Sequence, residues 1–505
     1  MKKSSVCSAL SGALFCFVAQ AEPVWISIEA KVLQAVPAVA VLQRQPVILG
    51  DAVLQSGQQP VLVQVNEADL PLLSAYIHDA QHRCGGYFAY DSLEQALQAL
   101  TQPLLAATFV APPLTQQNLV NSHLPQLNQA GIAQFISDLS QFTNRYYTTS
   151  SGSQSADWIA SQWQSLANPH SWMKVSRQSH SGYPQRSVLL EVTGSEKPDE
   201  IVVLGGHLDS IVSGGTGETT RAPGADDDAS GIATLSEIIR VLSSAGLRPK
   251  RTIRFYGYAA EEVGLRGSKD IATAAASSGQ RVIAAMQLDM TNFKGSAEDI
   301  VLMTDYTNAS LNEYLQKLIS TYQPALRHTT DVCGYGCSDH ASWHNAGFAA
   351  AMPFEARFAG SNKKIHSGSD TLANSDPSAQ HALKFARLGL SFVLELGNAV
   401  TGTPPDGSSG SFVDLAASSG NWVFKTIAVP AGKTQLNVTM SGGSGDADLY
   451  LRAGSNPTTS SYQCRPYKTG NNESCSIANP AAGNWMVGVR AYSSFSGVSV
   501  NWQLR

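Results

Sequence analysis

Apolar and polar residues follow two different periodicities through the middle of the chain. Short apolar runs of the kind that form buried strands occur at residues 187–193, 201–205, 251–258, 282–288 and 300–304. Between and after them, apolar residues recur every three or four positions, which is the spacing of one helix face. Helices are expected on this basis at 231–244, 267–278, 311–322 and 379–396, and a further buried strand at 348–352. The alternation predicts an α/β fold with a mixed, largely parallel sheet and helices on both faces.

Different patterns flank this segment. Residues 22–110 hold short apolar runs and a helical stretch near 93–100, and the sequence Ala111-Pro112-Pro113 that follows indicates an exposed, extended junction. Residues 401–411 are rich in Gly, Pro and Ser, as in a linker. Short alternating strands with turn residues then predict an all-β sandwich over 412–505. The α/β domain therefore spans about 111–400.

The first residues predict export. Met1-Lys2-Lys3 is basic, residues 6–18 are mostly apolar, and Ala19-Gln20-Ala21 is a small-x-small site. This order is typical of a secretory signal peptide, here residues 1–21. A membrane anchor is the alternative, but the apolar stretch is shorter than the roughly 20 residues that a span needs. We expect a secreted protein.

Cysteine spacing fits an oxidising compartment. Of the seven cysteines, Cys7 and Cys16 lie in the signal peptide and the partner of Cys84 is undetermined. The other four form two close pairs, which in an exported protein are expected to be disulfide loops. These pairs are Cys333 with Cys337 and Cys464 with Cys475. A cysteine zinc site is the alternative, but neither pair has a second close pair near it in sequence.

Composition narrows the classes of partner. A chain of 505 residues exceeds the roughly 100–200 residues of one ordinary domain. With 34 Lys and Arg against 39 Asp and Glu, its net charge of −5 argues against a nucleic-acid-binding protein. No apolar run is long enough to remain in a bilayer, so we expect no membrane partner.

Five short stretches carry side chains suited to chemistry, and three of them follow strand-like runs. They are residues 205–210, 223–231, 260–264, 287–290 and 365–367. Carboxyl ends of strands in an open α/β sheet form the crevice where ligands bind, so these stretches should converge. Two histidines with several carboxylates suit zinc better than calcium or magnesium. Each stretch alone is a weak signal, and Asp226–Asp228 also precede a helix that Asp228 is suited to cap.

The strings Gly-Gly-His-x-Asp-Ser, Pro-Gly-Ala-Asp-Asp-Asp-Ala-Ser-Gly and Glu-Glu-x-Gly, in this order, resemble the dizinc aminopeptidase family. The chain is most similar to secreted bacterial leucyl aminopeptidases of the vibrio type. The resemblance covers nearly the whole chain and implies the zinc exopeptidase fold with a C-terminal pre-peptidase-type domain. It also implies a zymogen, in which residues 22–110 are a pro-segment that assists folding and restrains activity until a maturation protease cuts near Val110. An ordinary N-terminal domain is the alternative for this segment.

The resemblance implies two zinc ions per chain. Asp227 bridges them, His207 and Asp289 complete the protein shell of one ion, and Glu262 and His366 complete that of the other. Two zinc ions, three carboxylates and one bridging hydroxide sum to a neutral cluster, and the metals lower the pKa of the bridging water.

Other roles follow from the same resemblance. Glu261 is the general base that takes a proton from the attacking water and gives it to the leaving amine. Asp209 orients the far nitrogen of His207, and the peptide bond between Asp227 and Asp228 is cis. Tyr335 either hydrogen-bonds the developing oxyanion or is a buried aromatic held by the neighbouring disulfide.

Substrate preference is the next implication. An apolar pocket would favour leucine and other large hydrophobic residues at the free N-terminus of a peptide. Its expected lining is Met290, Cys337, Met352, Phe354, Phe358 and Ile365. Residues of these types also form ordinary cores. Residues 359–364 lack the aromatic expected from the family, which leaves the breadth of specificity open.

Three alternatives remain. A single-zinc glutaminyl cyclase shares the fold, but a full set of five ligands favours two metals. A non-catalytic binding protein on this scaffold and a carboxypeptidase are the others. His340 and His344, four residues apart, are interpreted as structural, Asp446 and Asp448 as a turn rather than a calcium site, and the protein as a monomer.

Overall fold

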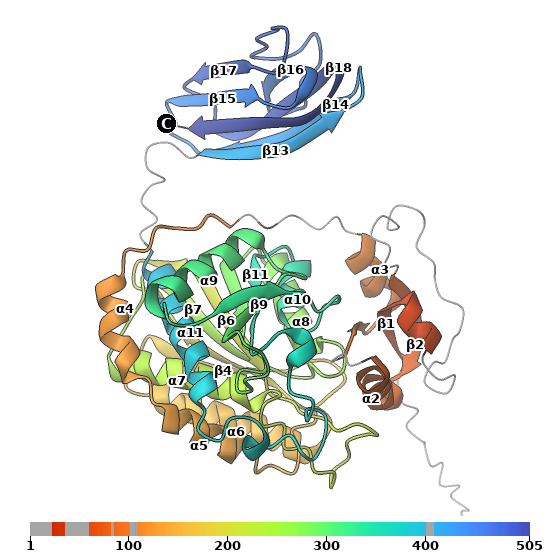
Figure 1. Cartoon of the computed structure of the whole chain (residues 1–505), viewed down its shortest axis with the longest axis vertical. Coiled ribbons are helices and arrows are strands. Elements are labelled where there is room, and N and C mark those ends of the chain that lie inside the picture. The colour runs from red at the N-terminus through yellow and green to blue at the C-terminus, as the bar shows by residue number, and fades with distance from the viewer. Residues whose placement is uncertain are drawn as a thin grey trace, which may run out of the picture. The chain divides into compact units, whose positions relative to one another are not determined.

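The computed structural model describes residues 23–35, 60–81, 85–101, 107, 109–399 and 409–504. It divides into two compact units, Met1–Ala399 and Val400–Arg505, which Figure 1 shows in colour from red to blue along the chain. The predicted signal peptide, Cys84 and most of the predicted linker lie outside the described residues.

A six-stranded sheet forms the centre of the first unit, and it confirms the predicted mixed, largely parallel arrangement. Its strand order is β11-β8-β6-β7-β5-β4. Strands β11, β8, β6 and β7 run parallel, β5 is antiparallel to β7, and β4 is antiparallel to β5. The strands are β4 (Met173–Gln178), β5 (Ser187–Val192), β6 (Lys197–His207), β7 (Arg251–Tyr258), β8 (Arg281–Gln287) and β11 (Ala350–Ala351).

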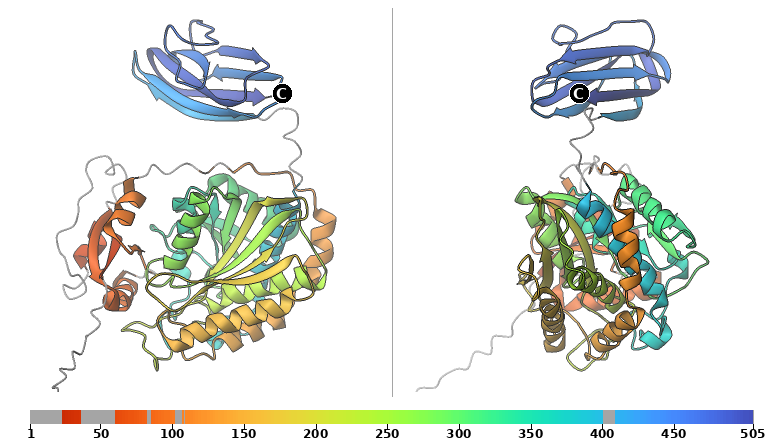
Figure 2. Two further views of the ribbon diagram at one scale, coloured as in Figure 1. Left: turned by 180° about the vertical axis from the view of Figure 1, so that it is seen from behind. Right: turned by 90° about the vertical axis from the view of Figure 1, so that its left-hand side faces the viewer.

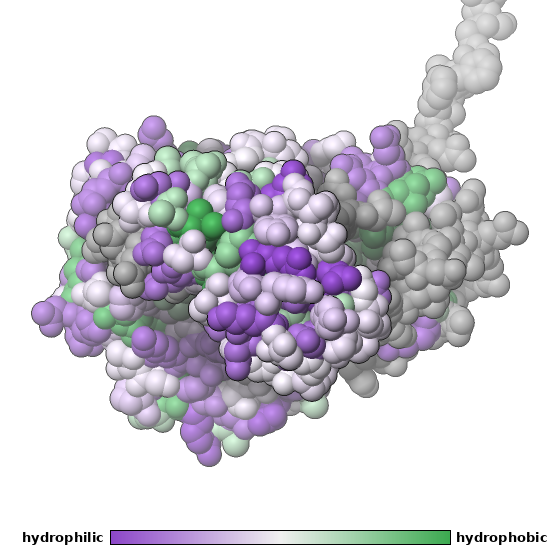
Figure 3. Space-filling view, turned by 90° about the horizontal axis from the view of Figure 1, so that it is seen from above, coloured by the Kyte–Doolittle hydropathy of each residue, from purple (hydrophilic) through white to green (hydrophobic). Residues whose placement is uncertain are grey.

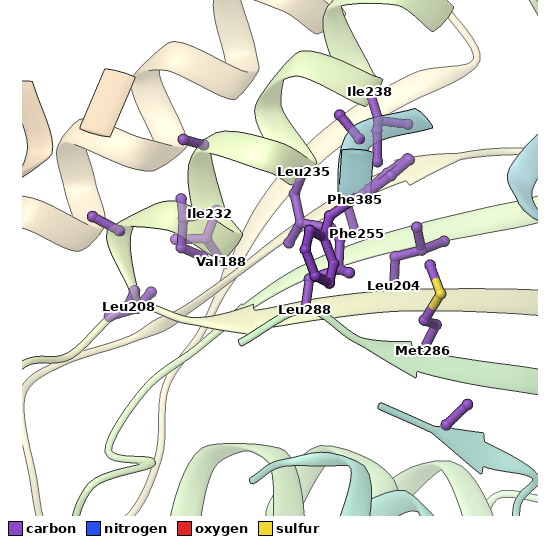
Figure 4. Close-up of a cluster of buried hydrophobic side chains, with 14 of the residues drawn as sticks. Val188, Leu204, Leu208, Ile232, Leu235, Ile238, Phe255, Met286, Leu288 and Phe385 are labelled. Atoms are coloured by element: carbon purple, nitrogen blue, oxygen red, sulfur yellow. The ribbon is translucent and has the colours of Figure 1, made fainter. Parts of the chain in front are cut away.

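Helices cover both faces of this sheet (Figure 2). Because successive strand residues point to opposite faces, Leu204 and Phe255 lie on one face, in the same core cluster as Leu235 of a covering helix (Figure 4). On the other face Tyr256 belongs to a separate core cluster. The first face carries α5 (Gln129–Leu139), α6 (Ser150–Ala167), α7 (Ala229–Ser244) and α11 (Gln380–Asn398), and the second α8 (Arg266–Ser277) and α10 (His340–Asn345).

The strand predicted at 348–352 is observed, but it is shorter than expected and comprises only β11. Strand β11 pairs with β8 in the large sheet, whereas β12 (Pro353–Phe354) pairs with β9 (Ile300–Met303) in a small sheet completed by β10 (His328–Asp331). Pro353 has no N–H group to donate, which favours a break between the two pairings. Helices α4 (Gln117–His123) and α9 (Ala309–Tyr322) complete this part of the chain.

The segment predicted as a pro-segment folds as a small α/β layer within the first unit. Its antiparallel sheet has the order β2-β1-β3. Its elements are β1 (Pro23–Glu29), α1 (Ala30–Ala35), β2 (Pro60–Asn66), the 3₁₀ turn η3 (Glu67–Asp69), α2 (Leu70–Gln81), β3 (Tyr87–Tyr90) and α3 (Leu93–Thr101). Only α3 was predicted as an element. Val110, near the predicted cut, is 80% exposed.

The second unit is all-β, as predicted, with its own apolar core. Its strands are β13 (Ser409–Ala417), β14 (Trp422–Val429), β15 (Gln435–Ser441), β16 (Ser444–Ala453), β17 (Glu473–Ala478) and β18 (Gly483–Leu504). Two expectations are corrected here. Strand β13 already begins at Ser409, within the predicted linker. Residues 483–504, where short strands are expected, form one long strand, because β18 pairs with partners along its whole length.

Asp446 and Asp448 lie in strand β16 rather than in the predicted turn, and each makes a polar contact within this unit. Asp446 accepts a hydrogen bond from the Gly470 N–H (2.9 Å), and Asp448 lies 3.5 Å from Arg465. On the face drawn in Figure 3, hydrophobic side chains occur in small groups among hydrophilic ones. Among the described helices, none has the length and apolar character needed to cross a membrane.

Candidate functional site

The parallel strands deliver four candidate side chains to one edge of the central sheet. His207 is the last residue of β6, Glu261 and Glu262 follow β7, and Asp289 follows β8. Because β6 lies between β7 and β8, their carboxyl ends meet, and the predicted convergence is observed. Asp227 comes from the loop that leads into α7.

Five predicted ligands form two overlapping groups around Asp227. His207, Asp227 and Asp289 make one group, and Asp227, Glu262 and His366 make the other, with the ligand atoms of each group within 4.8 Å of one another. One Asp227 oxygen lies 2.9 Å from His207 Nε2, and the other lies 3.1 Å from His366 Nε2. The two oxygens of a single carboxylate thus face two separate groups, which is the geometry of a bridging ligand.

The chemistry of these atoms fits metal ions better than hydrogen bonding alone. Glu262 Oε1 and Asp289 Oδ1 are buried acceptors without a hydrogen-bond partner, while Glu262 Oε2 and His366 Nε2 face each other at 2.8 Å. Buried acceptors without partners are costly, and three carboxylates with two imidazoles are a donor set that suits zinc. The described residues can therefore hold cations at both groups.

Electrostatics also favours positive charge here. Burial alone raises the pKa of Asp227, but the imidazoles at its two oxygens more than offset this and leave its pKa well below the ordinary value. Burial lowers the pKa of His207, yet Asp289 and Glu261 outweigh it and raise the net pKa. Burial raises the pKa of Glu262 to about 7. The cluster thus favours cations, and metal ions held by these residues would supply that positive charge.

Three further aspartates hold the backbone that carries the ligands. Asp209 accepts hydrogen bonds from the N–H groups of Glu261 (3.0 Å) and Glu262 (3.2 Å), while its Oδ1 lies 3.5 Å from His207 Nδ1. Asp228 accepts from the His207 N–H (3.0 Å) and, as the predicted helix cap, from the Gly231 N–H (2.8 Å). The peptide bond between Asp227 and Asp228 is cis.

Asp370, the third of these aspartates, was missed by the sequence analysis. Its two oxygens accept hydrogen bonds from the N–H groups of Asp226 (3.0 Å) and Asp227 (3.2 Å), and its side chain is buried. This carboxylate therefore fixes the loop that presents the bridging candidate. Only its proximity in sequence to His366 could have drawn attention to it.

Glu261 lies at the cluster without belonging to either ligand group. Burial raises the pKa of Glu261 well above its usual range. Two hydrogen bonds hold the backbone just before Glu261. Ser187 Oγ accepts a hydrogen bond from the Ala259 N–H (3.0 Å), and Gln185 Oε1 accepts one from the Ala260 N–H (3.3 Å). A buried carboxyl beside two cation sites, but not within them, is placed to exchange protons.

An apolar cavity of about 720 Å³ opens beside the cluster and touches Asp289. All six predicted pocket residues line it, namely Met290, Cys337, Met352, Phe354, Phe358 and Ile365. Tyr335 and the Cys333–Cys337 disulfide form part of the same wall, and the second disulfide joins Cys464 to Cys475. The cavity also contacts Lys363 and His78, neither of which was predicted. His78 arrives from α2, in the N-terminal layer, so no local sequence signal marks it.

The α/β sheet, the paired ligand groups at its carboxyl edge and the adjoining apolar cavity define a zinc-dependent exopeptidase class of site. Comparison of the sequence with known families agrees with this. Residues 187–390 match peptidase family M28, and residues 423–491 match the bacterial pre-peptidase C-terminal domain. The chain belongs to peptidase family M28, and it is a zinc-dependent aminopeptidase of that family.

Individual relatives support the assignment. The chain is 32% identical to a probable aminopeptidase of Saccharomyces cerevisiae over 59% of its own length and 80% of that protein. It is 31% identical to a probable leucine aminopeptidase of Arthroderma otae, over 72% of this chain and 97% of the relative. The crystal structure of the LapA aminopeptidase of Legionella pneumophila superposes with a TM-score of 0.64 at 26% identity, covering 74% of this chain and 98% of LapA.

Proposed function

We propose that this aminopeptidase binds two zinc ions and removes leucine and other large hydrophobic residues from the free N-terminus of peptides. The observation that carries the proposal is the pair of ligand groups sharing Asp227. A site for one metal ion requires only one ligand group, whereas here two complete ligand groups face the two oxygens of one carboxylate. Zinc, when bound, supplies a Lewis acid for the scissile carbonyl and lowers the pKa of water.

The protein's own residues then perform three tasks. Glu261 accepts a proton from the attacking water and transfers it to the leaving amine, since its carboxyl is at the cluster but outside both groups. Asp209 keeps Glu261 and Glu262 in place through their backbone N–H groups. Tyr335 donates a hydrogen bond to the developing oxyanion, a role supported by its position in the cavity wall.

Preference for leucine rests on the lining of the cavity. Met290, Met352, Phe354 and Ile365 are each at most 5% exposed and lie in one apolar cluster. A large apolar side chain gains free energy when it leaves water for such a wall. The relative from Arthroderma otae is named a probable leucine aminopeptidase, which fits this preference.

Secretion and zymogen maturation complete the proposal. The N-terminal sequence has the order of a signal peptide, and two disulfides suit an exported protein. We infer that a maturation protease cuts the exposed stretch near Val110 and that the mature enzyme acts as a monomer on peptides.

The neighbouring residues Glu261 and Glu262 allow a test of the proposed function with a matched control. Glu261→Gln should retain about two zinc ions per chain and lose at least about 100-fold in kcat on leucine p-nitroanilide, the minimum for a general base. Glu262→Gln, the matched control, should lose zinc, because it removes a ligand charge. Metal content is measured on the same samples that are assayed.

Three results would contradict the proposal. They are one zinc ion per fully active chain, normal turnover by Glu261→Gln, and equal cleavage of N-acetylated and free leucyl peptides. Release of ammonia with ring closure on an N-terminal glutamine peptide would instead favour the glutaminyl cyclase alternative.

A further inference from the structure

The N-terminal layer touches the metal-site loops through helix α2. Ser74 Oγ donates a hydrogen bond to the Glu262 carbonyl oxygen (2.8 Å) and also bonds to the Tyr87 hydroxyl (2.8 Å). His78 lies one turn further on the same helix face. Its ring centroid is 4.5 Å from that of His366, and it forms part of the cavity wall. Helix α2 therefore ends with a side chain inside the proposed substrate pocket.

Strand β3 makes a second contact close by. The Ala89 N–H donates to the Gly264 carbonyl oxygen (3.1 Å), and Lys269 Nζ donates to the Ala89 carbonyl oxygen. Phe88 packs so closely on Gly336, in the Cys333–Cys337 loop, that a Cβ at this glycine would lie 2.7 Å from the Phe88 ring. The layer thus contacts loops on two sides of the pocket.

A buried guanidinium makes the third contact. Arg266 Nη1 lies 2.6 Å from Glu67 Oε1, and the Tyr147 hydroxyl donates to the same oxygen (3.2 Å). Only 4% of the Arg266 side chain is exposed, and its guanidinium carbon lies 4.8 Å above the Tyr183 ring. Arginine, with its fixed fork of donors, suits carboxylates, so the catalytic part presents a ready-made carboxylate-binding site.

We propose that Arg266 and Tyr147 form a carboxylate-binding site that Glu67 fills, and that this site latches the layer formed by residues 60–81 and 85–101 over the pocket with His78 inside it. The inference rests on the proposed function for its consequence, the exclusion of peptide substrates. It adds the residues that do the holding and the blocking.

Helix α2 connects the latch, which is Glu67 in its carboxylate-binding site, to the plug, which is His78 in the pocket. Glu67 is the first residue of the 3₁₀ turn η3, which leads directly into α2, and His78 is eleven positions further on, roughly 16–18 Å along these consecutive helical turns. A rigid helix anchored at one end holds its other end in place. Removing Glu67 leaves a buried cation without its close partner, which is strongly unfavourable for that interface. The secondary contact of Arg266 with Asp91 is longer, at 3.4 Å.

The first experiment measures the latch without relying on catalysis. The full zinc-loaded chain is cut once by limited proteolysis near Val110, and the fraction of the N-terminal segment that co-elutes with the body is measured by gel filtration. We expect the wild-type segment to stay bound and Glu67→Gln to weaken its retention at least about tenfold. Glu94→Gln, the same change at an exposed position of the same layer, should behave as wild type.

The second experiment measures the plug. The uncut chain is expected to hydrolyse leucine p-nitroanilide at least about tenfold more slowly than the cut chain freed of its segment. His78→Ala and Glu67→Gln should each raise the rate of the uncut chain and leave the rate of the freed enzyme unchanged. Circular dichroism of the uncut variants checks that the layer remains folded.

The outcomes separate the two proposals. Equal retention of the wild-type and Glu67→Gln segments would overturn the latch, and equal rates for uncut His78→Ala and uncut wild type would overturn the plug. A freed enzyme without aminopeptidase activity would contradict the proposed function, whereas the retention result still decides the latch.

Discussion

Asp370 shows how much a single buried carboxylate contributes to this site. It is neither among the residues that line the cavity nor in either ligand group, yet it accepts hydrogen bonds from the N–H groups of Asp226 and Asp227. A group of this kind sets the orientation of the Asp227 carboxylate rather than its chemistry. Groups that orient metal ligands are often nearly as important as the ligands themselves.

Asp370→Ala should therefore weaken zinc binding by about 10–100-fold. The two N–H groups lose their acceptor, and the Asp227 loop is free to turn. The measurement is zinc affinity by competition with a chromogenic chelator. Activity restored at saturating zinc would support a positioning role, and unchanged affinity would refute it.

His340 is the clearest buried neutral histidine, in agreement with its structural interpretation. It is 1% exposed, and its Nε2–H donates to the Asp305 carbonyl oxygen (3.2 Å). Burial lowers the pKa of His340 from 6.5 to about 3. Between these values the unfolded chain binds a proton that the folded chain excludes, so this residue favours unfolding as the pH falls below about 6.5.

Wild type should consequently lose stability relative to His340→Gln on acidification, by about 1.4 kcal/mol for each pH unit below 6.5. Glutamine keeps a donor for the Asp305 carbonyl but does not titrate. Denaturant unfolding of both proteins at pH 7 and pH 5, with equal zinc loading, checks this. Parallel changes in the two proteins would contradict it.

At the scale of elements, the junction between β6, β8 and α7 controls where the ligands lie. A Cβ on Gly231 would collide with the Leu288 carbonyl oxygen and with the Asp228 carboxylate. Leu288 precedes Asp289, and Asp228 follows Asp227. The first turn of α7 thus approaches both ligand loops so closely that only glycine fits.

Gly231→Ala should destabilise the protein by about 1–3 kcal/mol through overpacking and reduce its zinc content. Gly217→Ala is the matched control, since the nearest atom to its added Cβ would be 3.8 Å away. Unfolding free energies and metal analysis of both variants provide the readout. A Gly231→Ala variant with wild-type stability and zinc content would contradict the prediction, because it would show that the junction accommodates a Cβ at this position.

The pattern of apolar residues predicts the long helices and strands best. Strand β7 was predicted with its observed bounds, and α7 began only two residues earlier than expected, because both are long and strongly periodic. Helices α5 and α6 were not predicted as elements, although each has a capping side chain, Asn128 and Thr149. Strand β12 was missed because two residues carry too little periodicity to detect.

For the whole molecule, the two units bury separate cores. Every residue of the C-terminal core lies between Leu415 and Leu504, and the candidate metal ligands all belong to the first unit. Units with independent cores generally fold independently. The second unit thus contributes no ligand or pocket residue among those described.

A chain ending at Ala399 should accordingly bind zinc as the full chain does and, once freed of its N-terminal segment, hydrolyse leucine p-nitroanilide within about twofold of the full-length rate. Metal content, kcat/KM and the unfolding midpoint of the two proteins test this. A truncated chain that folds but loses more than about tenfold in kcat/KM would assign the second unit a part in catalysis.

The sequence by itself determined the α/β sheet, the β-domain and the five candidate ligands. Long periodic segments determine their own secondary structure. His207, Glu262 and Asp289 lie at or just after strand ends, where ligands bind in open α/β sheets. The tertiary structure decided the contacts that join distant segments. Asp370 reaches Asp226 across 144 positions, and Glu67 reaches Arg266 across 199. Such pairings arise only when packing brings the chain together, so no local pattern encodes His78 in the pocket or the carboxylate that anchors the bridging loop.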